Sequence, residues 1–146
     1  MHYILDSSVI IKWFSHFDEE NVEQASILLD LFGEDMVKIS IPDLSVYEVG
    51  NALKHNKNFT PEEVKNIIGR LMDMGLDVVK VTKDLISKAI GIAYEEDITV
   101  YDAIFISIAD HLMTPLVTAD DRQYKAAKKG NIIRLNNIRY QGKENT

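Results

Sequence analysis

Four acidic residues stand where the chain could gather their carboxyl groups into one site. Asp6 directly follows the first apolar run, and Asp120 follows a later apolar run after a single intervening residue. Asp102 opens an otherwise apolar helical segment, and Glu48 lies inside a predicted helix on its apolar face. A carboxylate that faces a core is costly unless it is paired or bound to a cation. Because oxygen ligands suit Mg²⁺ or Mn²⁺ better than zinc, these residues indicate a site for a divalent metal.

A cluster of this kind could catalyse hydrolysis of a phosphodiester bond. Carboxylates packed together cannot all ionise cheaply, because like charges raise one another's pKa. A divalent ion removes that repulsion, polarises a phosphoryl oxygen and lowers the pKa of a bound water, so that hydroxide is available near neutral pH. With two ions about 4 Å apart, one activates water and the other holds the leaving oxygen.

Each acid also has a structural explanation. Asp6 could simply cap the helix that follows it, and either Asp120 or Asp121 could cap the last helix. Asp102, three residues after a threonine, could belong to a capping box. Caps do not occur in the middle of a helix, so Glu48 escapes this explanation, but its side chain could point to solvent.

The elements that would position these acids alternate between strands and helices. The predicted strands cover residues 2–5, 37–41, 77–81, 115–118 and 132–135. The predicted helices cover residues 9–14, 18–31, 43–54, 61–74, 83–94, 103–112 and 121–128. Strands separated by helical crossovers imply a mainly parallel sheet that is covered on both faces.

We therefore predict an α/β fold, a three-layer α/β/α sandwich around a central parallel sheet of five strands in the order 3-2-1-4-5. Asp6 and Asp120 can meet only if the first and fourth strands are neighbours, and ligands of open parallel sheets bind beyond the carboxyl ends of the strands. We expect a single domain over residues 1–140 and a short polar tail over residues 141–146. Asp18 should cap the second helix, with Gly33 beyond its end.

The composition is that of an ordinary globular protein. Of the 146 residues, 46% are hydrophobic and 27% are charged. There are no cysteines, which excludes disulfides and thiolate metal sites. No apolar run approaches the roughly 20 residues that a membrane span needs, and the N-terminus lacks a secretory pattern. We therefore expect a cytoplasmic protein that does not enter the membrane.

The charge is unevenly distributed along the chain. The net charge of −7 is at first sight a poor match to a polyanion. Residues 122–146 nevertheless contain a single acid and seven basic residues, Arg122, Lys125, Lys128, Lys129, Arg134, Arg139 and Lys143. This segment could be a solvated helix and tail, or an edge that faces phosphates beside the acids. On the second interpretation, Arg122, Lys125 and also Lys12 would contact a phosphate backbone.

Signatures of other chemistry are missing from the sequence. No G-x-G-x-x-G follows the first strand, and there is no G-x-x-x-x-G-K-[ST] for phosphate binding. No G-x-S-x-G marks a hydrolase serine, and the histidines show no H-E-x-x-H spacing.

Four motifs occur in the order LDSSVIIKWF, PDLSVYEVGNAL, TVYDAIFISIA and LVTADD. Together they resemble the PIN-domain family and, within it, the VapC-type toxins of bacterial and archaeal toxin–antitoxin pairs. The resemblance covers residues 2–135, nearly the whole chain. It implies a parallel α/β sandwich and a Mg²⁺- or Mn²⁺-dependent endoribonuclease that cleaves single-stranded or structured RNA.

The resemblance also assigns roles to the four acids. The family's acids fall on Asp6, Glu48, Asp102 and Asp120, and none of them is missing. We expect Asp6 to be the central metal ligand. Asp102 and Asp120 would complete the metal shell, and Glu48 would bind directly or through water.

Small polar residues next to the acids would orient carboxylates or waters. In the resemblance these residues fall on Ser7 or Ser8 and on Thr118, and Asp121 would lie beside them. The doubled acid Asp120-Asp121 leaves open which of the two contacts metal, although the T-x-D spacing favours Asp120.

The resemblance further implies an RNA substrate, an antitoxin partner and a homodimer. One alternative is a flap-type DNA nuclease, which shares such an acidic cluster. Another is a non-catalytic α/β binding module whose acids are only helix caps. A receiver-like domain would need paired acids after the first strand, and a dehalogenase-type phosphatase would need an aspartate where Ser8 stands.

Overall fold

The central sheet has five parallel strands in the order β3-β2-β1-β4-β5, which confirms the predicted topology. In chain order the strands are β1 (His2–Leu5), β2 (Lys38–Pro42), β3 (Asp77–Val79), β4 (Leu116–Thr118) and β5 (Ile132–Arg134). The computed structural model describes residues 1–127 and 130–139. The tail predicted at 141–146 therefore lies outside the described residues.

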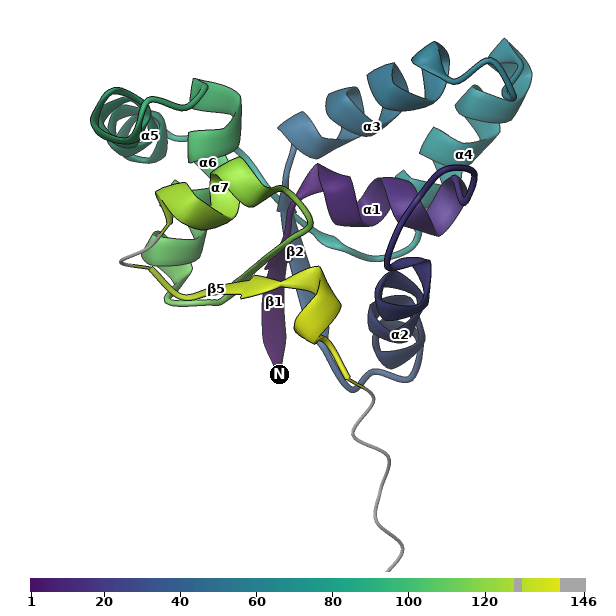
Figure 1. Ribbon diagram of the computed structural model, residues 1–146, viewed down its shortest axis with the longest axis horizontal. Helices are drawn as coiled ribbons and strands as arrows, with labels where there is room; N and C mark the ends of the chain where they lie inside the picture. The colour runs from purple at the N-terminus through teal and green to yellow at the C-terminus, as the bar shows by residue number, and fades with distance from the viewer. Residues whose placement is uncertain (128–129, 140–146) are drawn as a thin grey trace, which may run out of the picture.

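Helices cover both faces of the sheet, so the three-layer α/β/α arrangement is also confirmed (Figure 1). The helices are α1 (Ser7–Phe14), α2 (Val22–Gly33), α3 (Leu44–His55), α4 (Pro61–Asp73), α5 (Lys83–Glu96), α6 (Val100–Leu112) and α7 (Asp121–Ala126), and a short 3-10 turn η1 (Leu135–Asn137) follows β5. None of the helices in this part of the chain is both long and apolar enough to cross a membrane.

Alternate residues of the central strand β1 pack into two separate hydrophobic cores. Tyr3 and Leu5 pack into the core that α1 to α4 cover, whereas Ile4 packs into the core under α5 and α6. All three side chains are buried. A strand that is buried on both faces reads as a continuous apolar run, which is why its sequence indicates a strand of a parallel sheet.

The pairing of β1 with β4 determines where the functional edge lies. Ile4 is opposite Leu116 in the parallel register, and Leu5 is opposite Val117. The ladder continues one residue further, because the backbone N–H of Asp6 donates to the carbonyl of Val117 over 3.0 Å. Asp6 is thereby fixed beside the carboxyl end of β4.

The second helix begins later than the sequence predicted. Asp18 does not cap it, because Asp18 has a left-handed φ of 54° and belongs to the loop before the helix. Helix α2 starts at Val22 instead, after Asn21, which is also left-handed and makes no side-chain cap. The loop is drawn back toward α1, where Glu19 pairs with Lys12.

A polar chain at the opposite, amino edge ties three strands together. The imidazole Nε2 of His2 lies 2.7 Å from Ser40 Oγ, and this hydroxyl donates to Asp77 Oδ2 over 2.6 Å. Burial lowers the pKa of His2, and Lys38 lowers it further. The serine lies between the imidazole and the carboxylate, so this set joins β1, β2 and β3 rather than forming a nucleophile with its base.

The central strand should carry much of the stability of the fold. Ile4 is fully buried, and we expect Ile4→Ala to lower the free energy of unfolding by about 2–5 kcal/mol through lost burial and a residual cavity. Urea unfolding followed by circular dichroism measures this change. Val78 on the edge strand β3 is 44% exposed, and Val78→Ala should cost less than about 1 kcal/mol. Equal losses in the two variants would contradict the assignment of Ile4 to the core.

Candidate active site

Asp6 lies at the junction of β1 and α1. It is the N-cap of α1, and its Oδ2 accepts a hydrogen bond of 3.0 Å from the backbone N–H of Ser8. Its Oδ1 accepts one of 3.1 Å from the side-chain amide of Gln123, which comes from α7. The carboxylate is therefore both a helix cap and a buried link between two distant segments.

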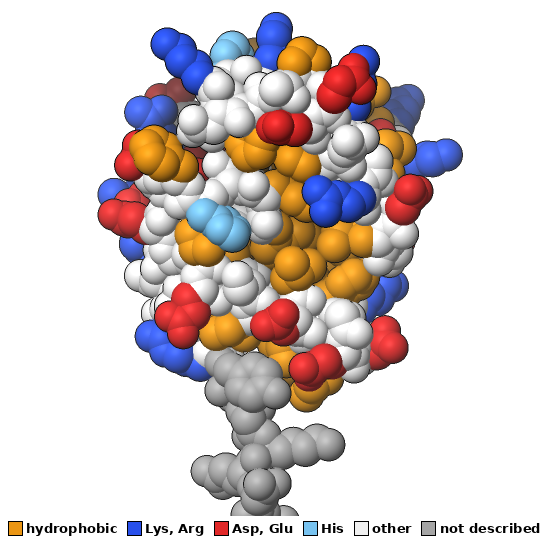
Figure 2. Space-filling model, turned by 90° about the vertical axis from the view of Figure 1, so that its right-hand side faces the viewer, with side chains coloured by type: hydrophobic (Ala, Val, Ile, Leu, Met, Phe, Trp, Pro, Cys, Tyr) orange, Lys and Arg blue, Asp and Glu red, His pale blue; other side chains and the backbone are white. Residues whose placement is uncertain are grey.

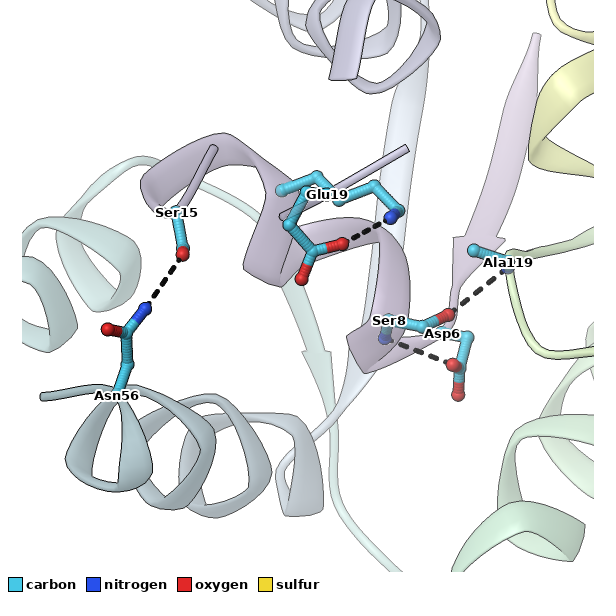
Figure 3. A network of polar contacts seen from close by, with 7 residues as sticks. Asp6, Ser8, Ser15, Glu19, Asn56 and Ala119 are labelled. Atoms are coloured by element: carbon cyan, nitrogen blue, oxygen red, sulfur yellow. Dashed lines mark hydrogen bonds and ion pairs between the residues drawn. The ribbon is translucent and has the colours of Figure 1, made fainter. Parts of the chain in front are cut away.

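Asp120 lies beside Asp6 because serine and threonine hydroxyls shape the turn after β4. Ser8 Oγ accepts a hydrogen bond of 3.1 Å from the backbone N–H of Ala119, which joins α1 to this turn (Figure 3). Thr118 Oγ1 accepts one of 3.0 Å from the backbone N–H of Asp120. Asp120 then caps α7 by accepting from the backbone N–H of Gln123 over 3.0 Å.

Glu48 reaches the same edge from α3. Its Oε1 accepts a hydrogen bond of 2.9 Å from the hydroxyl of Ser7, so the side chain points toward α1. A second bond at the other end of α1, from Asn56 Nδ2 to Ser15 Oγ over 3.1 Å, also joins α1 to α3 (Figure 3). These two contacts hold the helices side by side and keep Glu48 facing the start of α1.

Asp102 lies in the first turn of α6. The hydroxyl of Thr99, the N-cap of this helix, accepts a hydrogen bond of 3.0 Å from the backbone N–H of Asp102. The backbone carbonyl of Asp102 accepts a bond of 3.2 Å from the amide of Gln123. The amide of Gln123 therefore bonds both Asp102 and Asp6.

Burial and neighbouring charge raise the pKa of three of the four carboxyl groups. Burial, the largest cause, raises the pKa of Asp6, and the charge of Asp120 raises it further. Burial also raises the pKa of Glu48 to about 7, with added repulsion from Asp6 and Asp102. The pKa of Asp102 rises through burial and through its proximity to Asp6 and Asp120.

Helix termini and polar groups offset part of this repulsion. Asp6 and Asp120 are the N-caps of α1 and α7, and Asp102 lies in the first turn of α6. The N-terminus of a helix carries partial positive charge that favours nearby anions. The hydrogen bonds from Ser8 and Gln123 also act to lower the pKa of Asp6.

The side chains as they stand do not form a finished metal site. Over residues 1–127 and 130–139, no group of three or more Asp, Glu or His residues is arranged so that it could hold a metal ion. The gathering of all four carboxyl groups around one cation therefore stays a prediction. In this metal-free arrangement Asp6, Glu48 and Asp120 each accept hydrogen bonds from donors of the protein, and each carboxylate keeps further lone pairs.

Asp121 lies apart from the other acids. Its side chain is 73% exposed, and its Oδ1 accepts a hydrogen bond of 2.9 Å from Arg134 Nη1. The guanidinium of Arg134 in turn lies 4.2 Å from the centre of the Tyr124 ring. Asp121 is therefore part of a surface ion pair, whereas Asp120 faces the carboxyl groups of the cluster.

The three basic residues predicted to contact phosphate lie in different environments. Lys12 is buried and its ammonium lies 2.5 Å from the carboxylate of Glu19, so it has no free charge to offer a ligand (Figure 3). Arg122 is exposed and close enough to Asp102 to lower its pKa. Lys125 is exposed on α7. Of the other basic residues counted above, Lys128, Lys129 and Lys143 lie outside the described residues.

Gln123 is the residue that sequence reasoning missed. It is completely buried, it touches Asp6, and its backbone N–H bonds Asp120. The only signal was its position three residues after Asp120, where a glutamine usually completes a capping box. In the structure the glutamine side chain reaches across to Asp6 instead.

A polar pocket adjoins the cluster on the β4–β5 side. Its lining includes Thr118 and Asp120, together with Asn21, Arg134 and Asn136. The cluster therefore lies next to a pocket that contains both hydrogen-bond donors and acceptors.

The family model that describes the PIN domain matches residues 3–129 of this chain. A comparison with curated proteins finds no match.

Comparison with solved structures finds the same fold in several proteins. PAE2754 from Pyrobaculum aerophilum is 20% identical with a TM-score of 0.65, over 93% of this chain and 90% of that one. VapBC2 from Rickettsia felis, solved with a DNA fragment from its promoter, is 16% identical with a TM-score of 0.69, over 92% and 98%. FitAcB from Neisseria gonorrhoeae is 16% identical with a TM-score of 0.68, over 93% and 99%. At these identities the likeness establishes the fold.

The raised pKa of Glu48 predicts how stability depends on pH. With a pKa near 7 in the fold and 4.5 as the ordinary value, the folded state binds more protons than the unfolded state between these values. The stability of the metal-free protein should therefore fall as the pH rises through this window. Glu48→Gln keeps the acceptor for Ser7 but cannot ionise. As the pH rises from 5 to 8, the melting temperature of Glu48→Gln should therefore increase relative to that of wild type.

Thermal melts in the presence of a chelator measure this gain. Glu23→Gln, at an exposed position of α2, removes the same charge from a residue outside the cluster and serves as the control. A constant difference between Glu48→Gln and wild type at every pH would contradict the burial of an ionisable Glu48.

Proposed function

The chain belongs to the PIN-domain family, a family of nucleases, and from this premise we propose that it is a metal-dependent endoribonuclease. It would hydrolyse phosphodiester bonds of RNA. The observation that carries the proposal is the set of four carboxyl groups at the carboxyl edge of the sheet, three of which have raised pKa values. A protein gains nothing in stability from such repulsion, so the cluster indicates a functional site.

The donor set fits Mg²⁺ or Mn²⁺. Every candidate ligand is a carboxylate oxygen, and hard divalent cations prefer such ligands. A bound cation would relieve the repulsion that raises the pKa of Asp6, Glu48 and Asp102. We assign Asp6 as the central ligand because it is the most deeply buried of the four and is coupled to Asp120. Asp102 and Asp120 would complete the shell, with Glu48 bound directly or through water.

A bound metal would polarise a phosphoryl oxygen and lower the pKa of water bound to it. The residues of the chain position the acids for this chemistry. Ser7 orients Glu48, while Ser8 fixes the turn that carries Asp120. Thr118 holds the backbone of Asp120 in place.

Arg122 and Lys125 are the residues that we propose to contact the RNA backbone. Both are exposed on α7, whose first residue follows Asp120. Arg122 also lies close to Asp102, so its guanidinium can meet a phosphate that approaches the acids. The polar pocket beside Asp120 offers room for a neighbouring nucleotide.

We further propose that the protein is the toxin of a toxin–antitoxin pair. The similar proteins include a toxin–antitoxin complex from Klebsiella pneumoniae, with a TM-score of 0.67 and 14% identity over 91% of this chain and 97% of that one. On this chain, hydrophobic side chains gather at the centre of the face that α2 and α4 form (Figure 2). On these two helices, partly buried Ile27, Leu31, Val64 and Ile68 pack against the core. An antitoxin would cover such a face. We also propose that the protein forms a homodimer and that it acts in the cytoplasm.

Replacing Asp6 separates catalysis from helix capping. Asparagine caps a helix about as well as aspartate, so Asp6→Asn keeps the start of α1 but removes one ligand charge. We expect it to abolish cleavage of RNA in Mg²⁺ or Mn²⁺. It should also lose the rise in melting temperature that metal binding gives wild type. Without metal it should be as stable as wild type or more stable, because one repulsion is gone.

Gel assays of RNA cleavage and thermal melts with and without Mn²⁺ check these outcomes. Full metal-dependent activity in purified Asp6→Asn would overturn the catalytic role of this cluster and leave Asp6 as a helix cap. Cleavage of flap or single-stranded DNA but not of RNA would replace the proposed substrate.

The exposed basic residues of α7 should govern the salt dependence of RNA binding. Each contact with a phosphate of single-stranded RNA contributes about 0.7 to the slope of log K against log salt concentration. Lys125→Ala should flatten that slope by about this amount, measured by fluorescence anisotropy in a chelator so that RNA is not cut. Lys57→Ala, in the exposed loop between α3 and α4, is the control and should leave the slope unchanged. An unaltered slope in Lys125→Ala would show that this lysine does not meet the RNA.

A further inference from the structure

Gln123 is a polar side chain in a place where helices normally bury apolar ones. It lies in the first turn of α7, and no part of it is exposed. Ala127, four residues later on the same face, packs into the core under α5 and α6. A buried amide is costly unless its donors and acceptors are paired, so its partners explain why it is tolerated.

Its donors are directed at the acidic cluster. Nε2 donates to Asp6 Oδ1 over 3.1 Å and to the backbone carbonyl of Asp102 over 3.2 Å. The backbone N–H of Gln123 donates to Asp120 Oδ1 over 3.0 Å. One residue therefore contacts three of the four acidic residues, which come from three different parts of the chain.

Its acceptor has no partner. Oε1 of Gln123 is buried and makes no hydrogen bond with the described residues. Exchanging the two ends of the amide would place Oε1 against Asp6 Oδ1, and two acceptors repel one another. The orientation with Nε2 toward Asp6 is thus fixed by Asp6, even though it leaves the oxygen unpaired. A methionine would fill the same length without this cost, so the position serves Asp6 rather than the packing of α7.

The contact leaves Asp6 able to bind a cation. An ionised carboxylate has about four lone-pair positions, two on each oxygen. Ser8 takes one on Oδ2, and Gln123 takes one on Oδ1. Each oxygen therefore keeps a free position, and each is held by one donor.

We propose that Gln123 is a positioning residue of the metal site, which fixes the Asp6 carboxylate in the orientation that binds a divalent cation. This inference rests on the proposed function, because it assigns a role toward the cation that Asp6 would bind. Partners that orient a metal ligand in this way typically change metal affinity 10- to 100-fold when they are removed.

The test is the affinity of the full-length protein for Mn²⁺, measured by isothermal titration calorimetry without RNA. Gln123→Met keeps the length of the side chain and removes the donor together with the unpaired oxygen. We expect its dissociation constant for Mn²⁺ to be about tenfold or more above that of wild type. Its melting temperature without metal should change little, because the lost hydrogen bonds and the removed unpaired acceptor act in opposite directions. Gln123→Leu is the second variant if Gln123→Met does not fold.

Gln24→Met, a glutamine-to-methionine change on α2, is the matched control and should bind Mn²⁺ as wild type does. A Gln123 variant that folds and binds Mn²⁺ within twofold of wild type, or more tightly, would overturn the positioning role while leaving the proposed nuclease function intact. Wild-type protein that binds no Mn²⁺ would overturn both.

Discussion

Repulsion among four partly buried carboxyl groups is the constraint around which this end of the molecule is organised. The parallel pairing of β1 with β4 fixes Asp6 next to the turn that carries Asp120. Once those two acids are adjacent, Glu48 from α3 and Asp102 from α6 complete a cluster in which burial and mutual charge raise the pKa of each buried member. A cation that entered this arrangement would relieve the repulsion.

The surrounding structure supplies partial compensation in several small ways. The N-termini of α1, α6 and α7 face the acids, and serine, threonine and glutamine side chains direct donors or hold turns beside them. The capping and catalytic interpretations of Asp6 and Asp120 are therefore not exclusive. Each carboxylate caps a helix through one oxygen and keeps lone pairs for a cation, so the same residue stabilises the fold and prepares the site.

Sequence alone predicts the sheet and the edge at which the acids lie, because both depend on local patterns. The apolar runs of β1 and β4 identify buried parallel strands, and the acids that follow them locate the carboxyl edge. The errors arise where partners are distant in sequence. Asp18 resembles a cap, yet it lies in a loop with a left-handed φ, beside the Glu19 that pairs with Lys12. Gln123 resembles half of a capping box, and its true partner Asp6 is 117 residues away.

The most direct test of a divalent metal site among these acids is the location of the cation itself. Crystals grown with Mn²⁺ can be measured at the manganese absorption edge, where anomalous differences reveal only the metal. A peak enclosed by the carboxylates of Asp6, Asp102 and Asp120, with Glu48 at its side, is the predicted result. Manganese found only on exposed acids such as Asp121, with no peak at the cluster, would contradict it.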